Sequence, residues 1–185
     1  DGITLRGETP LGGLAQQRNL QTAAAVTESL SEAFGLSRNH FIRGVRGVVE
    51  NTGLMGRWQV LSRLPLTVCD TGHNREGLEY VMRQVMETPK ENLHMVIGFV
   101  NDKDLSSVLP LFPKNATYYF TRASVPRALD ENLLMAAAGG YGLSGRAFHT
   151  VKEAVEAART AAGPRDMIFI GGSTFVVADA PEVRQ

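Results

Sequence analysis

From Gly56 onward, short apolar segments alternate with longer amphipathic ones, and this alternation limits the chain to few folds. The short segments are typical of buried β-strands, and the segments between them have the spacing of helices. Strands that alternate with helices of this length form βαβ crossovers, which place parallel strands in one sheet covered on both faces. The pattern therefore predicts an α/β, Rossmann-like fold with a mostly parallel sheet.

The individual elements can be placed by residue number. Strands are predicted at residues 57–63, 66–69, 94–99, 117–121, 145–149 and 167–170. Helices are predicted near residues 75–87, 104–112, 129–138 and 151–162, with a last one after Gly172. The first two strands are expected to form a hairpin that adds one antiparallel edge strand to the sheet.

Residues 1–53 have a different character. Residues 15–34 predict a helix closed by Gly35, and Ser37 is expected to be the N-cap of a second helix that ends at residues 51–53. The apolar face of the first would comprise Leu20, Ala23, Ala24, Val26, Leu30 and Phe34. The second would bury His40, Phe41, Val45, Val48 and Val49. This part is too short to build its own sheet, so we interpret it as the end of a preceding domain and a linker.

Composition narrows the class of protein further. The chain has 185 residues, 43% of them hydrophobic, and a formal net charge of +0, which gives no reason to expect a nucleic acid or a membrane surface as partner. The single cysteine, Cys69, rules out an internal disulfide and favours a reducing, cytoplasmic compartment. Because the chain begins at Asp1 in what reads as a strand, we expect it to be part of a longer protein.

Polar or glycine-rich loops follow several of the predicted strands. They lie at residues 70–74, 98–104, 121–123 and 171–174. Because the strands before them are expected to run in one direction, these loops should gather at one edge of the sheet, where open α/β sheets bind ligands. The helix N-termini at that edge favour anions.

Each polar residue of these loops also has a structural interpretation. Asp70 could be a turn residue, and Asn74, Asp104 and Ser173 could be helix N-caps. Arg57 could be a surface arginine on an edge strand. On spacing alone, the structural and functional interpretations remain open.

Of the histidines, only His73 is placed for chemistry, and we expect His40, His94 and His149 to be structural. No Cys/His cluster has zinc-ligand spacing, so no metal ligands are predicted. Neither a Walker A motif nor Gly-x-Gly-x-x-Gly after the first strand is present, which disfavours a P-loop in this segment and a dinucleotide-dependent oxidoreductase.

Four motifs, in order, resemble the C-terminal domain of the folylpolyglutamate synthase/dihydrofolate synthase family within the Mur ligase superfamily. They are residues 56–59 (GRWQ), 69–74 (CDTGHN), 98–104 (GFVNDKD) and 171–173 (GGS). Residues 16–19 (QQRN) resemble the helix that closes the family's central ATPase domain. One departure is Gly72, where the family usually has alanine; it leaves the polar residues of the motif unchanged.

The resemblance implies a division into a C-terminal remnant of the central ATPase domain with a linker (1–53) and the Mur ligase C-terminal domain (54–185). It also implies a ligase that uses ATP and Mg²⁺ to join L-glutamate to folate or dihydropteroate through an acyl phosphate. The P-loop and Mg²⁺ ligands would belong to the central ATPase domain of the same full-length chain, so this segment alone is expected to be inactive.

Site residues follow from the resemblance by position. Asn19 would contact adenine, Arg57 the ATP phosphates, and Asp70 the nucleotide through its ribose hydroxyls, while Lys103 would contact phosphates or substrate. His73 and Ser173 would line the glutamate and acyl-phosphate side as catalytic residues. Two alternatives stay open: another Mur-type amino-acid ligase, against which the Asp-Lys-Asp loop argues, and a non-catalytic Rossmann-like module that binds a nucleotide or a partner.

Overall fold

The computed structural model describes residues 8–181. The chain forms two compact units, Asp1–Met55 and Gly56–Gln185. None of the helices within residues 8–181 is long and apolar enough to cross a membrane.

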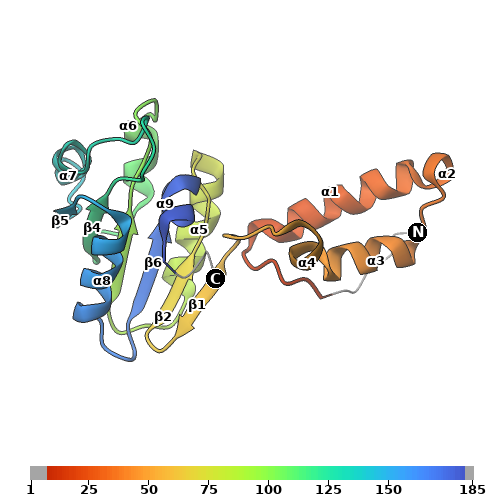
Figure 1. Ribbon diagram of the computed structural model, residues 1–185, viewed down its shortest axis with the longest axis horizontal. Helices are drawn as coiled ribbons and strands as arrows, with labels where there is room; N and C mark the ends of the chain where they lie inside the picture. The colour runs from red at the N-terminus through yellow and green to blue at the C-terminus, as the bar shows by residue number, and fades with distance from the viewer. Residues whose placement is uncertain (1–7, 182–185) are drawn as a thin grey trace. The chain divides into compact units, whose positions relative to one another are not determined.

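The second unit is built on a six-stranded sheet (Figure 1). Its strands are β1 (Gln59–Arg63), β2 (Leu66–Cys69), β3 (Leu93–Ile97), β4 (Thr117–Thr121), β5 (Gly145–Phe148) and β6 (Met167–Gly171). They lie in the order β1-β2-β6-β3-β4-β5. Only β1 is antiparallel to its neighbour, and the other four pairs are parallel. The predicted mostly parallel sheet with one antiparallel edge strand is confirmed.

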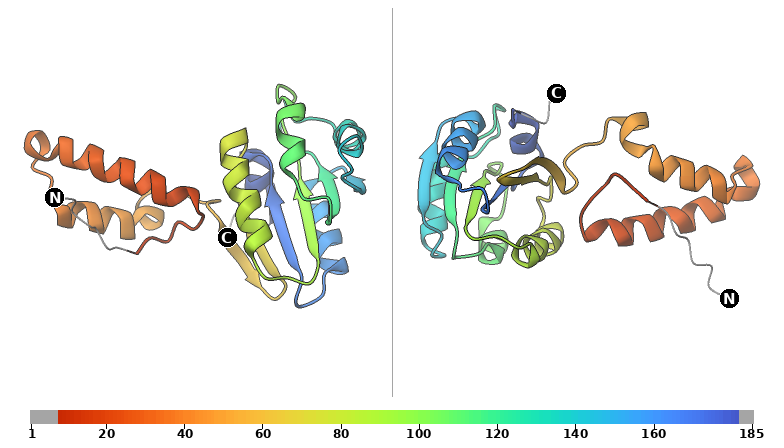
Figure 2. Two further views of the ribbon diagram at one scale, coloured as in Figure 1. Left: turned by 180° about the vertical axis from the view of Figure 1, so that it is seen from behind. Right: turned by 90° about the horizontal axis from the view of Figure 1, so that it is seen from below.

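Helices cover both faces of this sheet (Figures 1 and 2). One face carries α5 (Arg75–Glu87), α6 (Leu105–Val108), the 3₁₀ turn η1 (Leu109–Leu111) and α7 (Glu131–Gly139). The other carries α8 (Val151–Ala161) and α9 (Thr174–Asp179). Each face has its own apolar core. The fully buried β6 feeds both, because successive side chains point to opposite faces: Phe169 packs in the first core and Ile170 in the second.

Several predicted boundaries differ from the structure, and two of the differences have clear local reasons. The helix predicted over residues 104–112 is split into α6 and η1, because Pro110 has no N–H to continue an α-helical ladder. The strand predicted from Arg57 starts at Gln59, because Gly56 and Trp58 have φ angles of 72° and 48° and form a turn.

The first unit consists of α1 (Ala15–Ser29), α2 (Ser31–Phe34), α3 (Arg38–Arg46) and α4 (Val48–Thr52) within its described residues. The helix predicted over residues 15–34 is therefore two helices that meet at Leu30. Gly35 ends α2 in the left-handed conformation, with a φ of 61°, as predicted. Ser37 caps α3 in a capping box with His40, which confirms both the cap and a structural role for this histidine.

The predicted apolar faces of this unit are not buried. Val26, Leu30 and Phe34 are 50%, 40% and 69% exposed, and the described helices of the unit contain no fully buried residue. His40 is exposed, and the apolar residues of the stripe predicted for the second helix are only half-buried. Helical spacing reveals an apolar face, but it does not show how much of that face other elements cover, and here Val26, Leu30 and Phe34 stay exposed.

Candidate functional site

Asp70 lies directly after β2, at the carboxyl-end edge of the sheet, and both its oxygens are engaged. Oδ2 accepts a hydrogen bond from the backbone N–H of Trp58 at 2.7 Å, and Oδ1 accepts one from Gly72 at 2.7 Å. The side chain is almost fully buried. Burial raises the pKa of Asp70 above its ordinary value, although these two hydrogen bonds and the nearby Arg57 charge oppose the rise.

Arg57 is held beside Asp70 by the turn before β1. Its Nη1 donates to the hydroxyl of Thr71, and this hydroxyl and the Thr71 N–H both donate to the carbonyl of Gly56, at 3.1 and 2.8 Å. Gly56 has a φ of 72°, and a Cβ there would lie 2.6 Å from the Thr71 Cγ2 atom. Only glycine fits this position, so the turn that presents Arg57 is set by the sequence itself.

The loops after the central strands touch one another at this edge. The N–H of Asp70 donates to the carbonyl of Ile170 at 3.1 Å, and the N–H of Gly98 donates to that of Gly171 at 3.3 Å. A Cβ on Gly172, which has a φ of 88°, would lie 2.8 Å from the Gly98 carbonyl oxygen. The predicted gathering of the loops after β2, β3 and β6 is therefore confirmed.

His73 and Ser173 lie on these loops, and each has a local hydrogen bond. His73 is exposed, and its Nδ1 lies 3.1 Å from the Thr71 carbonyl oxygen, so Nδ1 carries the proton. Ser173 is buried and its hydroxyl accepts from the N–H of Phe175 at 3.2 Å, as an N-cap of α9. The capping role of Ser173 is confirmed, and the catalytic roles of both residues stay predictions.

The remaining predicted residues have less defined surroundings. Lys103 is half-buried on the loop after β3, and the neighbouring Asp104 caps α6 by accepting from Ser106 at 3.0 Å. Asn19 belongs to the first unit, where its amide donates to Gln16 at 3.2 Å. The predicted nucleotide contacts of Lys103 and Asn19 therefore also stay predictions.

The loop after β4 contributes a residue that the sequence did not single out. The guanidinium of Arg127 lies 4.9 Å from the ring centroid of Phe175 on α9. The carbonyl of Arg127 accepts from the N–H of Asn101 at 2.9 Å, which ties this loop to the loop after β3. In the sequence, the nearest indication of this residue is the predicted polar loop at residues 121–123, but Arg127 lies beyond that loop.

Outside this edge, His94 is structural, as predicted. Its Nδ1 lies 3.0 Å from the Tyr119 hydroxyl and its Nε2 lies 3.4 Å from Asp166, and all three groups are buried. Among the described residues, no three His, Cys, Asp or Glu side chains lie close enough to hold a metal ion.

Together, these features define a Rossmann-like ligand-binding domain. An arginine, a buried aspartate and glycine-rich loops meet at the carboxyl ends of parallel strands, where such domains bind anionic ligands. The chain belongs to the Mur ligase family, because residues 56–174 match its glutamate ligase domain.

Curated relatives and solved structures agree with this assignment. The chain is 30% identical over 183 residues to a probable bifunctional folylpolyglutamate synthase/dihydropteroate synthase of Haloferax volcanii. The aligned region covers 97% of this chain and 21% of that protein. The structure of E. coli FolC in complex with DHPP and ADP superposes with a TM-score of 0.77 at 27% identity, over 93% of this chain and 39% of that one. The Yersinia pestis bifunctional folylpolyglutamate synthase/dihydrofolate synthase complexed with AMPPNP and Mn ion gives a TM-score of 0.72 at 27% identity, over 95% and 40%. The chain thus spans between a fifth and two fifths of the length of these proteins.

Proposed function

We propose that this chain is the C-terminal portion of an ATP-dependent ligase that adds L-glutamate to folate, and also to dihydropteroate. The similarity over nearly the whole chain to proteins named folylpolyglutamate synthase or FolC supports folates as the substrate class. The observation that carries the proposal is the turn that presents Arg57 next to Asp70 at the carboxyl-end edge of the sheet. A planar guanidinium there suits phosphoryl oxygens, which it can bind with two parallel hydrogen bonds.

In the proposed reaction, a carboxylate oxygen of folate attacks the γ-phosphorus of ATP, and the bond to ADP breaks. The neutral amine of glutamate then attacks the acyl carbon, the bond from that carbon to the phosphate oxygen breaks, and the nitrogen loses one proton as the amide forms. Arg57 would stabilise the charge that develops on the transferred phosphoryl group. His73 and Ser173 would line the acyl-phosphate and glutamate side.

Asp70 suits a nucleotide contact only in a restricted way. Each of its oxygens already accepts one N–H, and each keeps a second lone pair that a ribose hydroxyl could use. Its side chain is nearly buried, so we propose that it also positions Arg57 through the Trp58 turn. Asn19 and Lys103 would complete the nucleotide contacts, on the adenine and phosphate sides respectively.

A divalent cation, Mg²⁺ by preference, would neutralise phosphate charge during transfer. Since the described residues hold no cluster of metal ligands, we propose that its ligands belong to a central ATPase domain of the same longer protein. The first unit would be the C-terminal end of that domain with a linker, and the rest of the domain would be the partner of the second unit. We place the reaction in the cytoplasm.

The test is made on the longest open reading frame that contains this chain. A frame with Gly-Lys-Ser/Thr upstream is expected, and its product should release phosphate from ATP only when both glutamate and folate or dihydropteroate are present. A frame no longer than this chain would instead favour the stand-alone binding module. A folded product that accepts a cell-wall precursor but no folate would favour another Mur-type ligase.

A further inference from the structure

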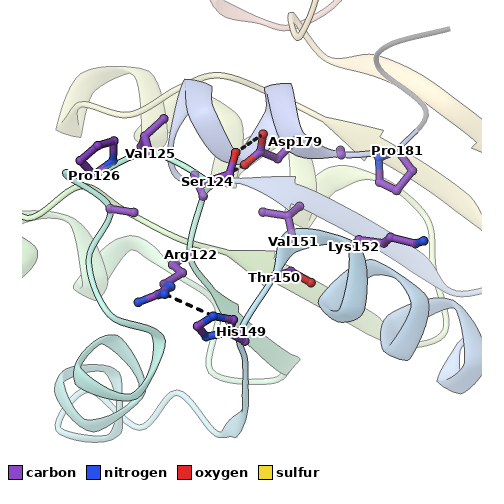
Figure 3. Close-up of a pocket in the computed structure, with 13 residues that line it drawn as sticks. Arg122, Ser124, Val125, Pro126, His149, Thr150, Val151, Lys152, Asp179 and Pro181 are labelled. Carbon is purple, nitrogen blue, oxygen red and sulfur yellow. Dashed lines mark hydrogen bonds between the residues drawn. The ribbon is translucent and has the colours of Figure 1, made fainter.

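A pocket of about 520 Å³ opens on the face of the sheet that α8 and α9 cover (Figure 3). Its walls come from the loop after β4, the start of α8 and the end of α9. The volume lies within the range of roughly 300–1,000 Å³ that is typical of small-molecule sites. None of the residues predicted for the ligase site lines it, so an inference about this pocket does not depend on the proposed function.

One end of the pocket carries a guanidinium and an imidazole that a buried carboxylate orients. Arg122 Nη2 lies 3.3 Å from His149 Nε2, and His149 Nδ1 lies 3.2 Å from an oxygen of Glu131 (Figure 3 shows the first contact). The geometry assigns the proton to Nδ1, so Nε2 accepts from Arg122. Glu131 also lies 3.5 Å from Arg122 Nε, and Asp130 lies 3.9 Å from Nη1. The permanent positive charge of Arg122 is thus held at the pocket wall.

The other end carries Lys152, in the first turn of α8. In Figure 3 its side chain lies on the opposite side of the pocket from Arg122, next to Pro181. It is 71% exposed and its ion pair with Glu156 is 3.8 Å long. Exposed pairs of this kind contribute little, so the ammonium can turn towards a ligand. The N-terminus of α8 adds a favourable dipole for an anion.

The pocket wall has apolar and polar parts. In Figure 3, Val151 lies between the two cations, Val125 and Pro126 lie on the side of Arg122, and the one carboxylate that lines the pocket, Asp179, is turned towards Ser124. Ser124 donates its N–H and its hydroxyl to Asp179, at 2.6 and 3.0 Å. A cation on each side of the apolar Val151 suits a short chain with a carboxylate at each end. We propose that this pocket binds a small aliphatic dicarboxylate, with one carboxylate at Arg122 and the other at Lys152.

The proposal is tested by titrating the ¹⁵N-labelled 185-residue chain with glutarate, butyrate or inorganic phosphate. Glutarate should give saturable shifts of the backbone amides of Ser124, Val151 and Lys152. It should bind more tightly than butyrate, by up to about fivefold, because one further exposed ion pair contributes at most about 1 kcal/mol. Shifts that do not saturate or that lie elsewhere would overturn the site. Phosphate binding as tight as that of glutarate would overturn the dicarboxylate assignment.

Two variants and a matched control assign the ends of the ligand. Lys152→Met should abolish the advantage of glutarate over butyrate, whereas Lys114→Met, which changes an exposed lysine outside the pocket, should leave it intact. Arg122→Gln should weaken both ligands. Since Lys152 is well exposed, its variant is expected to keep the amide spectrum of the parent, and an unchanged preference for glutarate in that folded variant would refute the proposal.

Discussion

The backbone N–H of Trp58 donates to the carboxylate of Asp70 at 2.7 Å, which joins the turn before β1 to the end of β2. Trp58 has a φ of 48°, a conformation that non-glycine residues rarely adopt, so this hydrogen bond helps to hold an unfavourable backbone. The same turn carries Arg57, whose guanidinium bonds to Thr71. The geometry of the predicted phosphate-binding arginine therefore depends on a buried aspartate.

We expect Arg57→Gln to raise the pKa of Asp70 further. Burial already raises this pKa above 3.8, and the Arg57 charge opposes the rise. Because the pKa of Asp70 is raised in the folded state, the stability that Asp70 contributes is fully present below its unfolded pKa and is lost as pH rises through its folded pKa. In the Arg57→Gln variant the folded pKa is higher still, so this loss of stability should continue to a higher pH. Carboxyl-carbon NMR titration measures the change, with Arg63→Gln on the same hairpin as control. An unchanged Asp70 pKa in the Arg57 variant would contradict the contact.

Gly98→Ala should destabilise the second unit strongly. An added Cβ would lie 2.3 Å from the Thr121 carbonyl oxygen and 2.9 Å from Val176, and neither the sheet backbone nor the core can move away cheaply. Overpacking of this kind costs about 1–3 kcal/mol or more of unfolding free energy. Gly139→Ala is the control, because nothing lies within 4 Å of its added Cβ; at the end of α7 it should be neutral or stabilising by up to about 1 kcal/mol. Urea denaturation of both variants makes the comparison.

Asp166→Ala should destabilise the opposite edge of the sheet. Asp166 accepts hydrogen bonds from the N–H groups of Asn92 and Gly163, at 2.9 and 2.7 Å, and it lies against His94. Leaving a buried donor unpaired costs about 1–3 kcal/mol, and since these two bonds are only partly buried, the loss for each should lie at the lower end of that range. These bonds, the Gly163 bond above all, lower the pKa of Asp166, so its stabilisation is present above the unfolded pKa and is lost as pH falls through the folded pKa.

The unfolding free energies of Asp166→Ala and of the parent, measured by denaturation between pH 2 and pH 7, should converge at the acidic end of the range. Asp102→Ala, at an exposed position on the loop after β3, is the control and should change the unfolding free energy little at any pH. A difference in unfolding free energy between Asp166→Ala and the parent that stays constant across the pH range would show that ionisation of Asp166 does not contribute to stability.

Local signals in the sequence predicted much of the second unit. The bounds of β2 and α5 were predicted without error, because a short apolar run and a regular 3.6-residue period are both unambiguous there. Asn74 caps α5 by accepting from the N–H of Gly77 at 2.9 Å, which is one of the two interpretations that residue type and position leave open. The shared edge of the loops followed from the alternation of strands and helices, since parallel strands end on the same side.

The features that local signals missed depend on contacts between distant residues. The positive φ of Trp58 is supported by Asp70, twelve residues further along, so residue type gave no indication of it. The pocket next to α8 joins Arg122 and His149, which follow different strands, so no local pattern in the sequence links them. The exposed face of α1 and α2 could not be distinguished from a buried one, because periodicity is the same in both cases.

Ser173 can be separated into its two proposed roles by Ser173→Asn. Asparagine caps helices as well as serine does, so the cap of α9 should be preserved, and urea denaturation shows whether the larger side chain is accommodated at this buried position. If the hydroxyl also lies on the acyl-phosphate side, the proposed full-length ligase should lose about tenfold or more in kcat, as expected when a donor to a developing anion is displaced. Asn74→Ser makes the reverse exchange at the N-cap of α5 and should leave kcat and stability unchanged. Full activity of a stable Ser173→Asn enzyme would show that the reaction does not need a hydroxyl at this position.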